Sequence, residues 1–198
     1  METLFDHPPD LPELPAGETL EQVQHAAAEH QCSNCRDKSR FIFGEGNANA
    51  RLMFIGESPS PEDAVVGRPF LGPTGEIMNK IIVAMGLKRE DCYLCNVLKC
   101  PMPAGKTADR ADIESCKPLL MRQIAAVRPK VIVAMGTVAA QTILNVKTPI
   151  SKLRGNFVSW NGMKVMATFN PAYLLRVPEK KREAWEDFKQ VRDYLKTV

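Results

Sequence analysis

The sequence predicts a doubly wound α/β fold, in which helices pack against a mostly parallel sheet. Short apolar runs recur along the 198 residues, at 52–55, 92–98, 131–135 and 165–169. Segments with helical spacing separate these runs, and strands that alternate with helices are typical of βαβ units. The length suits one domain with a substantial core.

The elements are expected in a simple order. Residues 1–17 are rich in proline and acidic side chains, so we expect a flexible tail followed by a single domain over 18–198. Asn161-Gly162 favours a hairpin turn, so one antiparallel strand should flank the last parallel strand. Helical spacing predicts helices over 18–30, 76–85, 109–127, 138–144 and 181–196.

Composition narrows the class of protein. Hydrophobic residues make up 44% and charged residues 25%, as in ordinary globular proteins, and the net charge of +3 permits a nucleic-acid partner without requiring one. The amino terminus lacks the apolar segment of a signal peptide. The longest apolar stretch, 131–144, is interrupted by polar residues and is too short to cross a bilayer. We therefore expect a cytoplasmic monomer with no membrane role.

Polar side chains follow the predicted strands. Glu57 comes after the first run, Asn96 lies near the end of the second, and Asn170 follows the fourth. Because the carboxyl ends of parallel strands share one edge of the sheet, these side chains should form one site. Phe70 stands in the Pro- and Gly-rich loop after Glu57 and is the candidate aromatic ring of that site. Taken singly, a glutamate and a phenylalanine at these positions are more often a surface carboxylate at a strand end and a core side chain.

The six cysteines suit metal ligation better than disulfides in a chain without a secretory signal. One possible set of four combines the CxxC turn at residues 32–35 with Cys92 and Cys95, as in zinc sites. Residues three apart in a strand point to opposite faces, which argues against that pair. Spacing alone does not distinguish zinc from an iron-sulfur cluster. The expected ligands are Cys32, Cys35, Cys100 and Cys116.

These residues lie in ordered blocks that resemble the family 4 uracil-DNA glycosylases. The resemblance runs from about Leu20 to Tyr194 and implies a three-layer α/β/α fold with a mainly parallel four-stranded central sheet. It further implies a 4Fe-4S cluster and hydrolysis of the N-glycosidic bond of uracil in single- or double-stranded DNA. The blocks are CSNC, FGEGNANARLMFIGESP, GRPFLGPTGE, NVLKCP followed by Cys116, Arg154-Gly155, and NPAYLLR leading to Trp185.

The resemblance also implies roles for single residues. Cys32, Cys35, Cys100 and Cys116 fall on the cluster ligands. Glu57 falls on the acidic residue of the first motif, Phe70 on the ring that stacks on the flipped base, and Asn96 on the amide that reads it. Ser58 is placed with the base-binding residues. An aromatic side chain at Phe70 fits base extrusion, because stacking offsets part of the free-energy cost of moving the base out of the helix.

The chain departs from the family pattern at two positions. Asn170-Pro171 stands where the last motif of the family begins with His-Pro, and Ser60 stands where the first motif usually has glycine. We expect Asn170 to act as a donor to the departing base. The change leaves two alternatives open: a glycosylase specific for deaminated purines or mismatched bases, and a lesion-binding protein without turnover.

Contacts to DNA are expected from the segment after the last strand. Arg176 and Lys180 are the candidate phosphate ligands, because phosphate contacts need only placed positive charge. Leu174 and Leu175 are candidates to wedge into the duplex, as apolar side chains do at kinked steps. Further basic candidates are Lys181, Arg182, Lys106 and Arg110.

Overall fold

A computed structural model describes residues 11–15, 17–30, 40–104 and 106–198. Its described strands form one six-stranded sheet in the order β1-β3-β2-β4-β6-β5. The four central strands are parallel, and the two edge strands, β1 and β5, are antiparallel to their neighbours. The strands are β1 (Glu45–Gly46), β2 (Leu52–Gly56), β3 (Tyr93–Asn96), β4 (Val131–Met135), β5 (Phe157–Trp160) and β6 (Met163–Thr168).

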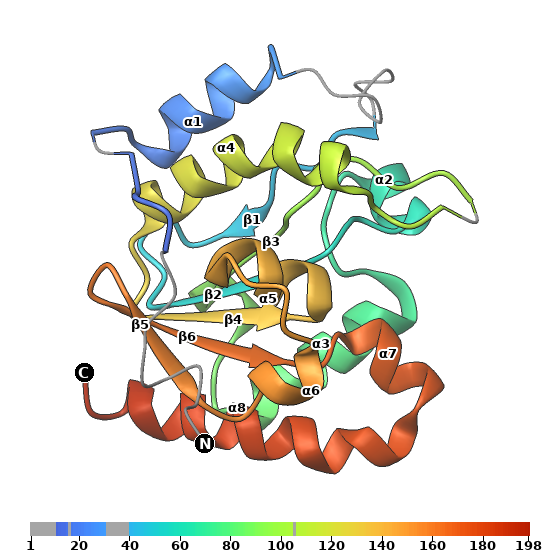
Figure 1. Cartoon of the computed structure of the whole chain (residues 1–198), viewed down its shortest axis with the longest axis vertical. Coiled ribbons are helices and arrows are strands. Elements are labelled where there is room, and N and C mark those ends of the chain that lie inside the picture. The colour runs from blue at the N-terminus through green and yellow to red at the C-terminus, as the bar shows by residue number, and fades with distance from the viewer. Residues whose placement is uncertain (1–10, 16, 31–39, 105) are drawn as a thin grey trace.

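Helices cover both faces of this sheet, as Figure 1 shows. The described helices are α1 (Leu20–Ala27), α2 (Pro61–Val66), α3 (Gly72–Ala84), α4 (Arg110–Val127), α5 (Thr137–Leu144), α6 (Ile150–Leu153), α7 (Pro171–Arg176) and α8 (Lys181–Leu195), with the 3₁₀ turns η2 (Arg89–Asp91) and η3 (Pro178–Lys180). Helices α4 and α5 pack on one face and α3 and α8 on the other. Helix α1 lies outside α4. The predicted three-layer α/β/α class is confirmed.

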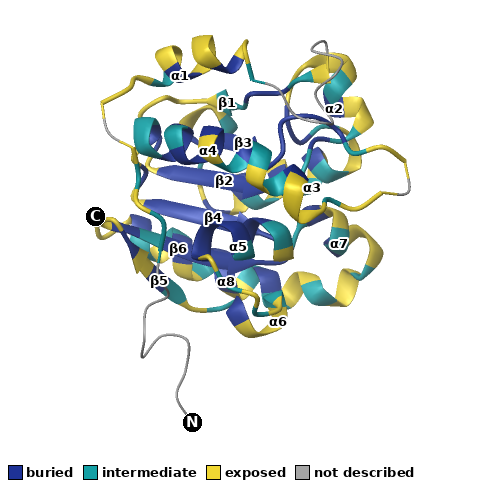
Figure 2. Ribbon diagram, turned by 45° about the horizontal axis from the view of Figure 1, so that its top comes forward, coloured by how far each residue is buried: buried dark blue, intermediate teal, exposed yellow. Residues whose placement is uncertain are grey.

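The continuous apolar runs follow from burial on both faces of the central strands. In β2, Met53 and Ile55 belong to the core under α4 and α5, whereas Leu52 and Phe54 belong to the core over α3 and α8. Successive side chains of a strand point to opposite faces, so a strand between two helical layers needs apolar residues at every position. The sheet is accordingly the most buried layer (Figure 2).

The sheet has six strands, whereas four parallel strands and one antiparallel neighbour were expected. The antiparallel strand predicted beside the last parallel one is β5, but β1 was not predicted because it has only two residues, too few for an apolar pattern. Helices α2, α6 and α7 were also missed, since four to six residues give no helical period. Local chemistry explains two of them: Ser60 and Asn170 are N-caps, each followed by a proline at the first helical position.

Much of the tail expected to be flexible lies outside the described residues. In its described part, Leu11 and Leu14 pack against the core under α4 and α5. The indole of Trp160 donates a hydrogen bond of 2.8 Å to the carbonyl of Pro12, which ties this segment to β5. Among the described residues, no helix is both long and apolar enough to span a membrane.

Candidate active site

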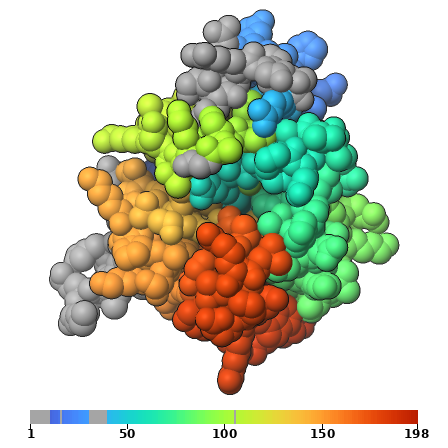
Figure 3. Space-filling model, turned by 90° about the vertical axis from the view of Figure 1, so that its right-hand side faces the viewer, coloured from blue at the N-terminus to red at the C-terminus, as the bar shows by residue number. Residues whose placement is uncertain are grey.

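A cavity of about 650 Å³ opens at the edge of the sheet where the parallel strands end. Figure 3 looks onto this edge and shows a hollow surrounded by α2, the segment before α4, the α5–α6 region and α7. The predicted strand-end residues therefore meet in one place. Of the predicted site residues, the cavity is lined by Glu57, Ser58, Phe70, Asn96, Asn170, Arg176 and Lys180.

Asn96 and Phe70 lie against the same bare stretch of backbone. Gly56 is the register partner of Asn96 in the β2–β3 ladder. A Cβ atom on Gly56 would lie 2.4 Å from Asn96 Oδ1 and 2.8 Å from Phe70 Cζ, so a glycine here is what lets the amide and the ring approach. Asn96 is 2% exposed, and its Oδ1 has no hydrogen-bond partner among the described residues. A buried acceptor without a donor is costly, and a ligand with an N–H group relieves that cost.

The Phe70 backbone adopts an unusual conformation. Its φ of 56° lies in the left-handed region, which bulky residues seldom occupy. A Cβ atom on Gly75 would come 2.1 Å from the Phe70 carbonyl oxygen, so glycine is required there too. The next amide, Leu71 N–H, donates to Oδ1 of the buried Asp63 at 2.7 Å. Such outliers cluster at ligand-binding sites and persist only where neighbouring groups hold them.

Glu57 stands just beyond the end of β2 with its side chain half-buried. Its carbonyl accepts from Leu98 N at 2.9 Å, so the β2–β3 pairing continues one step past the strands and fixes the residue. Burial raises the pKa of the Glu57 carboxyl above its ordinary value. A carboxylate partly removed from water interacts more strongly with a cationic centre that forms beside it.

The Asn170 amide makes two bonds that set its orientation. Its Oδ1 accepts from Ala172 N at 2.8 Å and caps α7, which directs Nδ2 the other way. Nδ2 donates to the Met135 carbonyl at the long distance of 3.4 Å. The Nδ2 group carries two hydrogens, so one donor remains for a ligand in the cavity that Asn170 lines. A Cβ atom on Gly136 would lie 3.1 Å from Asn170 Cβ, so the bare end of β4 makes room for this side chain.

A buried ion pair supports the strand that leads to Asn170. Asp187 accepts from Arg154 Nη2 at 2.7 Å and from the Thr168 hydroxyl at 2.6 Å. Burial raises the pKa of Asp187 and outweighs the opposing effects of Thr168 and Arg154. The Arg154 guanidinium lies 5.1 Å from the centre of the Phe169 ring, a cation–π distance. These contacts tie α8 to the end of β6, next to the cavity.

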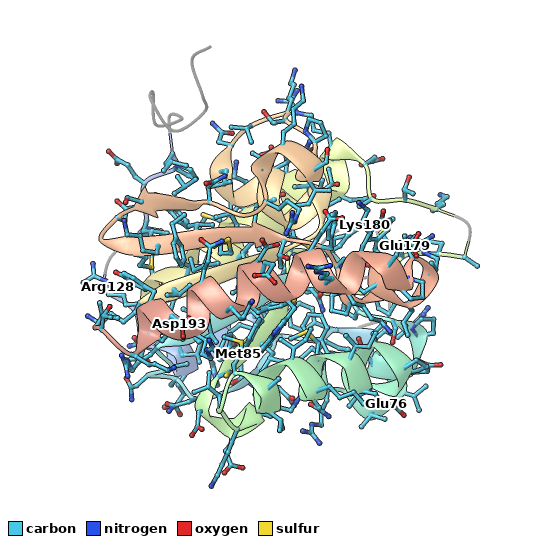
Figure 4. The ribbon with its side chains drawn as sticks, turned by 90° about the horizontal axis from the view of Figure 1, so that it is seen from below. Glu76, Met85, Arg128, Glu179, Lys180 and Asp193 are labelled. Carbon is cyan, nitrogen blue, oxygen red and sulfur yellow. The ribbon has the colours of Figure 1, made fainter. Side chains whose placement is uncertain are left out.

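The residues expected to touch DNA differ in exposure: Leu174 is buried, and the others lie at the surface. Arg176 is exposed on the cavity rim. Lys180, labelled in Figure 4, lies at the amino end of α8. Its Nζ pairs with Glu183 at 2.5 Å. Leu174 is 2% exposed and packs in the core over α3 and α8, so the expectation of a surface wedge is wrong for it. Leu175, at 40% exposed, points outward from the same helix.

Several cavity residues were not foreseen. Gly136 and Thr137 follow β4, and the strand-end argument would have found them had it been applied to the third apolar run as well. Phe169 directly precedes Asn170, but its place in an apolar run indicated only core. Glu183 comes from α8 and had no signal in the sequence.

Two of the four expected metal ligands lie in the described part of the chain. Cys100 and Cys116 are each 1% exposed, and Cys116 Sγ lies 3.6 Å from Nε2 of His30. Cys32 and Cys35 lie outside the described residues. No group of three or more metal-binding side chains occurs within the residues that are described. Cys92 and Cys95 belong to the cores on opposite faces of the sheet, which confirms that their side chains point in opposite directions.

The chain is similar to known proteins over most of its length. A family model described as the uracil DNA glycosylase superfamily matches residues 43–189. A type-4 uracil-DNA glycosylase of Thermotoga maritima is 35% identical over 187 residues, which are 90% of this chain and 97% of the relative. That of Archaeoglobus fulgidus is 36% identical, over 81% of this chain and 85% of its own length. That of Saccharolobus solfataricus is 34% identical, over 83% and 82%.

Proposed function

The chain belongs to the uracil-DNA glycosylase superfamily, and from that premise we propose how this uracil-DNA glycosylase captures and excises the base. The proposed reaction is hydrolysis of the N-glycosidic bond of deoxyuridine in DNA. The nucleotide is first extruded from the helix into the cavity at the edge of the sheet, because the bond is out of reach in a stacked duplex.

One observation supports uracil as the ligand: the unpartnered Oδ1 of Asn96 beside the ring of Phe70. Uracil offers an N3–H donor to that oxygen and an O4 acceptor to the amide nitrogen. Cytosine presents the opposite polarity at both atoms, so an amide held in one orientation rejects it. Stacking on Phe70 contributes roughly 1–3 kcal/mol toward the cost of extrusion.

Glu57 and Asn170 are proposed as the catalytic residues. Cleavage leaves positive character on the sugar and negative charge on the base. The Glu57 carboxylate stabilises the sugar cation and orients the attacking water, as carboxylates do in glycoside hydrolysis. The remaining N–H of the Asn170 amide donates to uracil O2 and stabilises the leaving anion. Both residues line the cavity, on the ends of different strands.

DNA is held by side chains around the cavity mouth. Arg176 on the rim is proposed as a phosphate ligand. Lys180 is proposed as a second, with a phosphate replacing Glu183 as its partner. Leu175 is the exposed residue of the two leucines and is proposed to fill the space that the extruded base leaves.

A 4Fe-4S cluster bound by Cys32, Cys35, Cys100 and Cys116 is proposed, and the described residues fit it. Cys100 and Cys116 are buried, as cluster ligands are. The ring of His30, two residues before Cys32 in the sequence, lies 3.6 Å from Cys116 Sγ, which supports a site shared by this segment and α4. The cluster supplies a four-thiolate crosslink between the amino-terminal region and the segment after β3.

Single-turnover excision from an oligonucleotide with one uracil tests the proposal. Wild-type protein should release uracil, and Asn96→Asp should damage excision, because a carboxylate repels O4 and gives it no donor. Asn49, an exposed residue before β2, provides the matched control as Asn49→Asp and should behave as wild type. Equal excision by wild type and Asn96→Asp would place the base elsewhere.

A second candidate, a wider base range, is favoured by Asn170 in place of the histidine of the family motif. Hypoxanthine- and xanthine-containing oligonucleotides are therefore included in the same assay. Excision of either at a rate comparable to uracil would support the wider range. Lesion binding without release of any base would support the non-catalytic alternative.

A further inference from the structure

We propose that Glu45, Asp63 and Arg89, from three different elements, are positioning residues that hold the Phe70 ring in place before a base arrives. The inference rests on the proposed function, since it concerns how the base is captured. The three residues are drawn from β1, α2 and η2, and each contacts the loop within two residues of Phe70.

Arg89 holds the chain on the amino side of the ring. Its Nη2 donates to the Pro69 carbonyl at 2.5 Å, and its Nε donates to Glu45 Oε1 at 2.7 Å. Glu45 also accepts from Arg68 Nε at 2.6 Å, so one carboxylate joins η2 to the loop. The two arginines lower the pKa of Glu45 despite its partial burial, which keeps it ionised.

Asp63 holds the chain on the carboxyl side of the ring. Its Oδ1 accepts from Leu71 N, and its Oδ2 accepts from Ser60 N at 3.0 Å. Because both oxygens of this buried side chain are used, an asparagine would leave one N–H without an acceptor. The peptide groups before and after Phe70 are thus bonded to different elements.

These bonds supply what the left-handed backbone of Phe70 requires. A residue in that region relaxes to a commoner conformation unless its surroundings prevent it. Relaxation would carry the ring away from Gly56, against which it packs beside the Asn96 amide. A ring that is already in place binds a base without a further entropic cost of ordering. The three positioning residues, Glu45, Asp63 and Arg89, form a clamp on the loop around Phe70, and this clamp should therefore raise the affinity for the base.

Inhibition by free uracil tests this, because it reports the base pocket without DNA contacts. The variant Arg89→Lys keeps the charge but loses the fork that bonds both Glu45 and Pro69. In the full chain with its cluster, we expect Arg89→Lys to raise the inhibition constant of uracil and the KM for uracil-DNA about tenfold. That change lies within the range expected for loss of one base–aromatic stacking interaction. We expect kcat and the affinity for abasic DNA to change less than about threefold. Arg122→Lys, in an exposed Arg–Glu fork on α4, is the matched control and should match wild type.

A double variant and an exchange measurement decide the mechanism. If Arg89 acts through the ring, Arg89→Lys adds no further loss in a Phe70→Ala background. Amide hydrogen exchange at Leu71 should accelerate in Arg89→Lys but not in Arg122→Lys, a readout that is independent of activity. Unchanged exchange at Leu71, an unchanged uracil inhibition constant, or an equal loss in the Phe70→Ala background would overturn the proposal. Failure of wild-type protein to excise uracil would instead reject the proposed function.

Discussion

Replacing Asn170 should separate two roles that one amide combines. Its Oδ1 caps α7 through Ala172 N, and its Nδ2 is the proposed donor to the departing base. Serine caps a helix as well as asparagine does, but its hydroxyl falls short of the Nδ2 position. Asn170→Ser should therefore keep the unfolding free energy within about 0.5 kcal/mol and slow excision by about a hundred- to a thousandfold, or about 2.7–4 kcal/mol.

Alanine removes both roles and completes the comparison. Asn170→Ala should show the same loss of rate and also lose the cap, about 1 kcal/mol, which lowers the Tm by about 2–4 °C for a domain of this size. Single-turnover excision with matched uracil substrates gives the rates, and urea and thermal unfolding give the stabilities. If both variants excise uracil within about threefold of wild type while Glu57→Gln is inactive, another residue stabilises the leaving base.

Other changes address the rest of the site. Gly56→Ala should abolish uracil capture at a cost of about 1–3 kcal/mol in stability, because its methyl would occupy the space of the Asn96 amide and the stacking ring; normal inhibition by free uracil would contradict this. Burial raises the pKa of Glu57, so excision should fall as pH decreases through that raised pKa, at a higher pH than for an exposed glutamate, and a rate independent of pH down to 4 would argue against Glu57. The same burial makes ionisation of Glu57 unfavourable to folding, so Glu57→Gln should be inactive yet more stable at neutral pH, as denaturant unfolding can measure. Protein purified without oxygen should be brown with about four irons per chain, and Cys32→Ser should lower its Tm; a colourless protein with one zinc would refute the cluster.

The sequence was informative where local patterns and burial agree. Strands 131–135 and 52–56 were predicted within one residue, because a strand covered on both faces must be apolar throughout. The edge strand β1 and the short helices α2 and α7 were not, because their stability depends on neighbours and not on a repeating pattern. The incorrect expectation for Leu174 has the same origin: without knowing that 171–176 is a helix, nothing indicated which leucine points inward.

The sequence by itself determined the fold class, the family resemblance, and the strand ends that carry Glu57, Asn96 and Asn170, since parallel strands must present their carboxyl ends at one edge. Tertiary structure alone decided how that edge becomes a pocket. Phe70, fourteen positions after Gly56, folds back over it, and the lack of a side chain on Gly56 leaves room for the ring. The clamp around that ring joins side chains from β1, α2 and η2. Contacts between residues so far apart in sequence depend on how the layers pack, which no local pattern encodes.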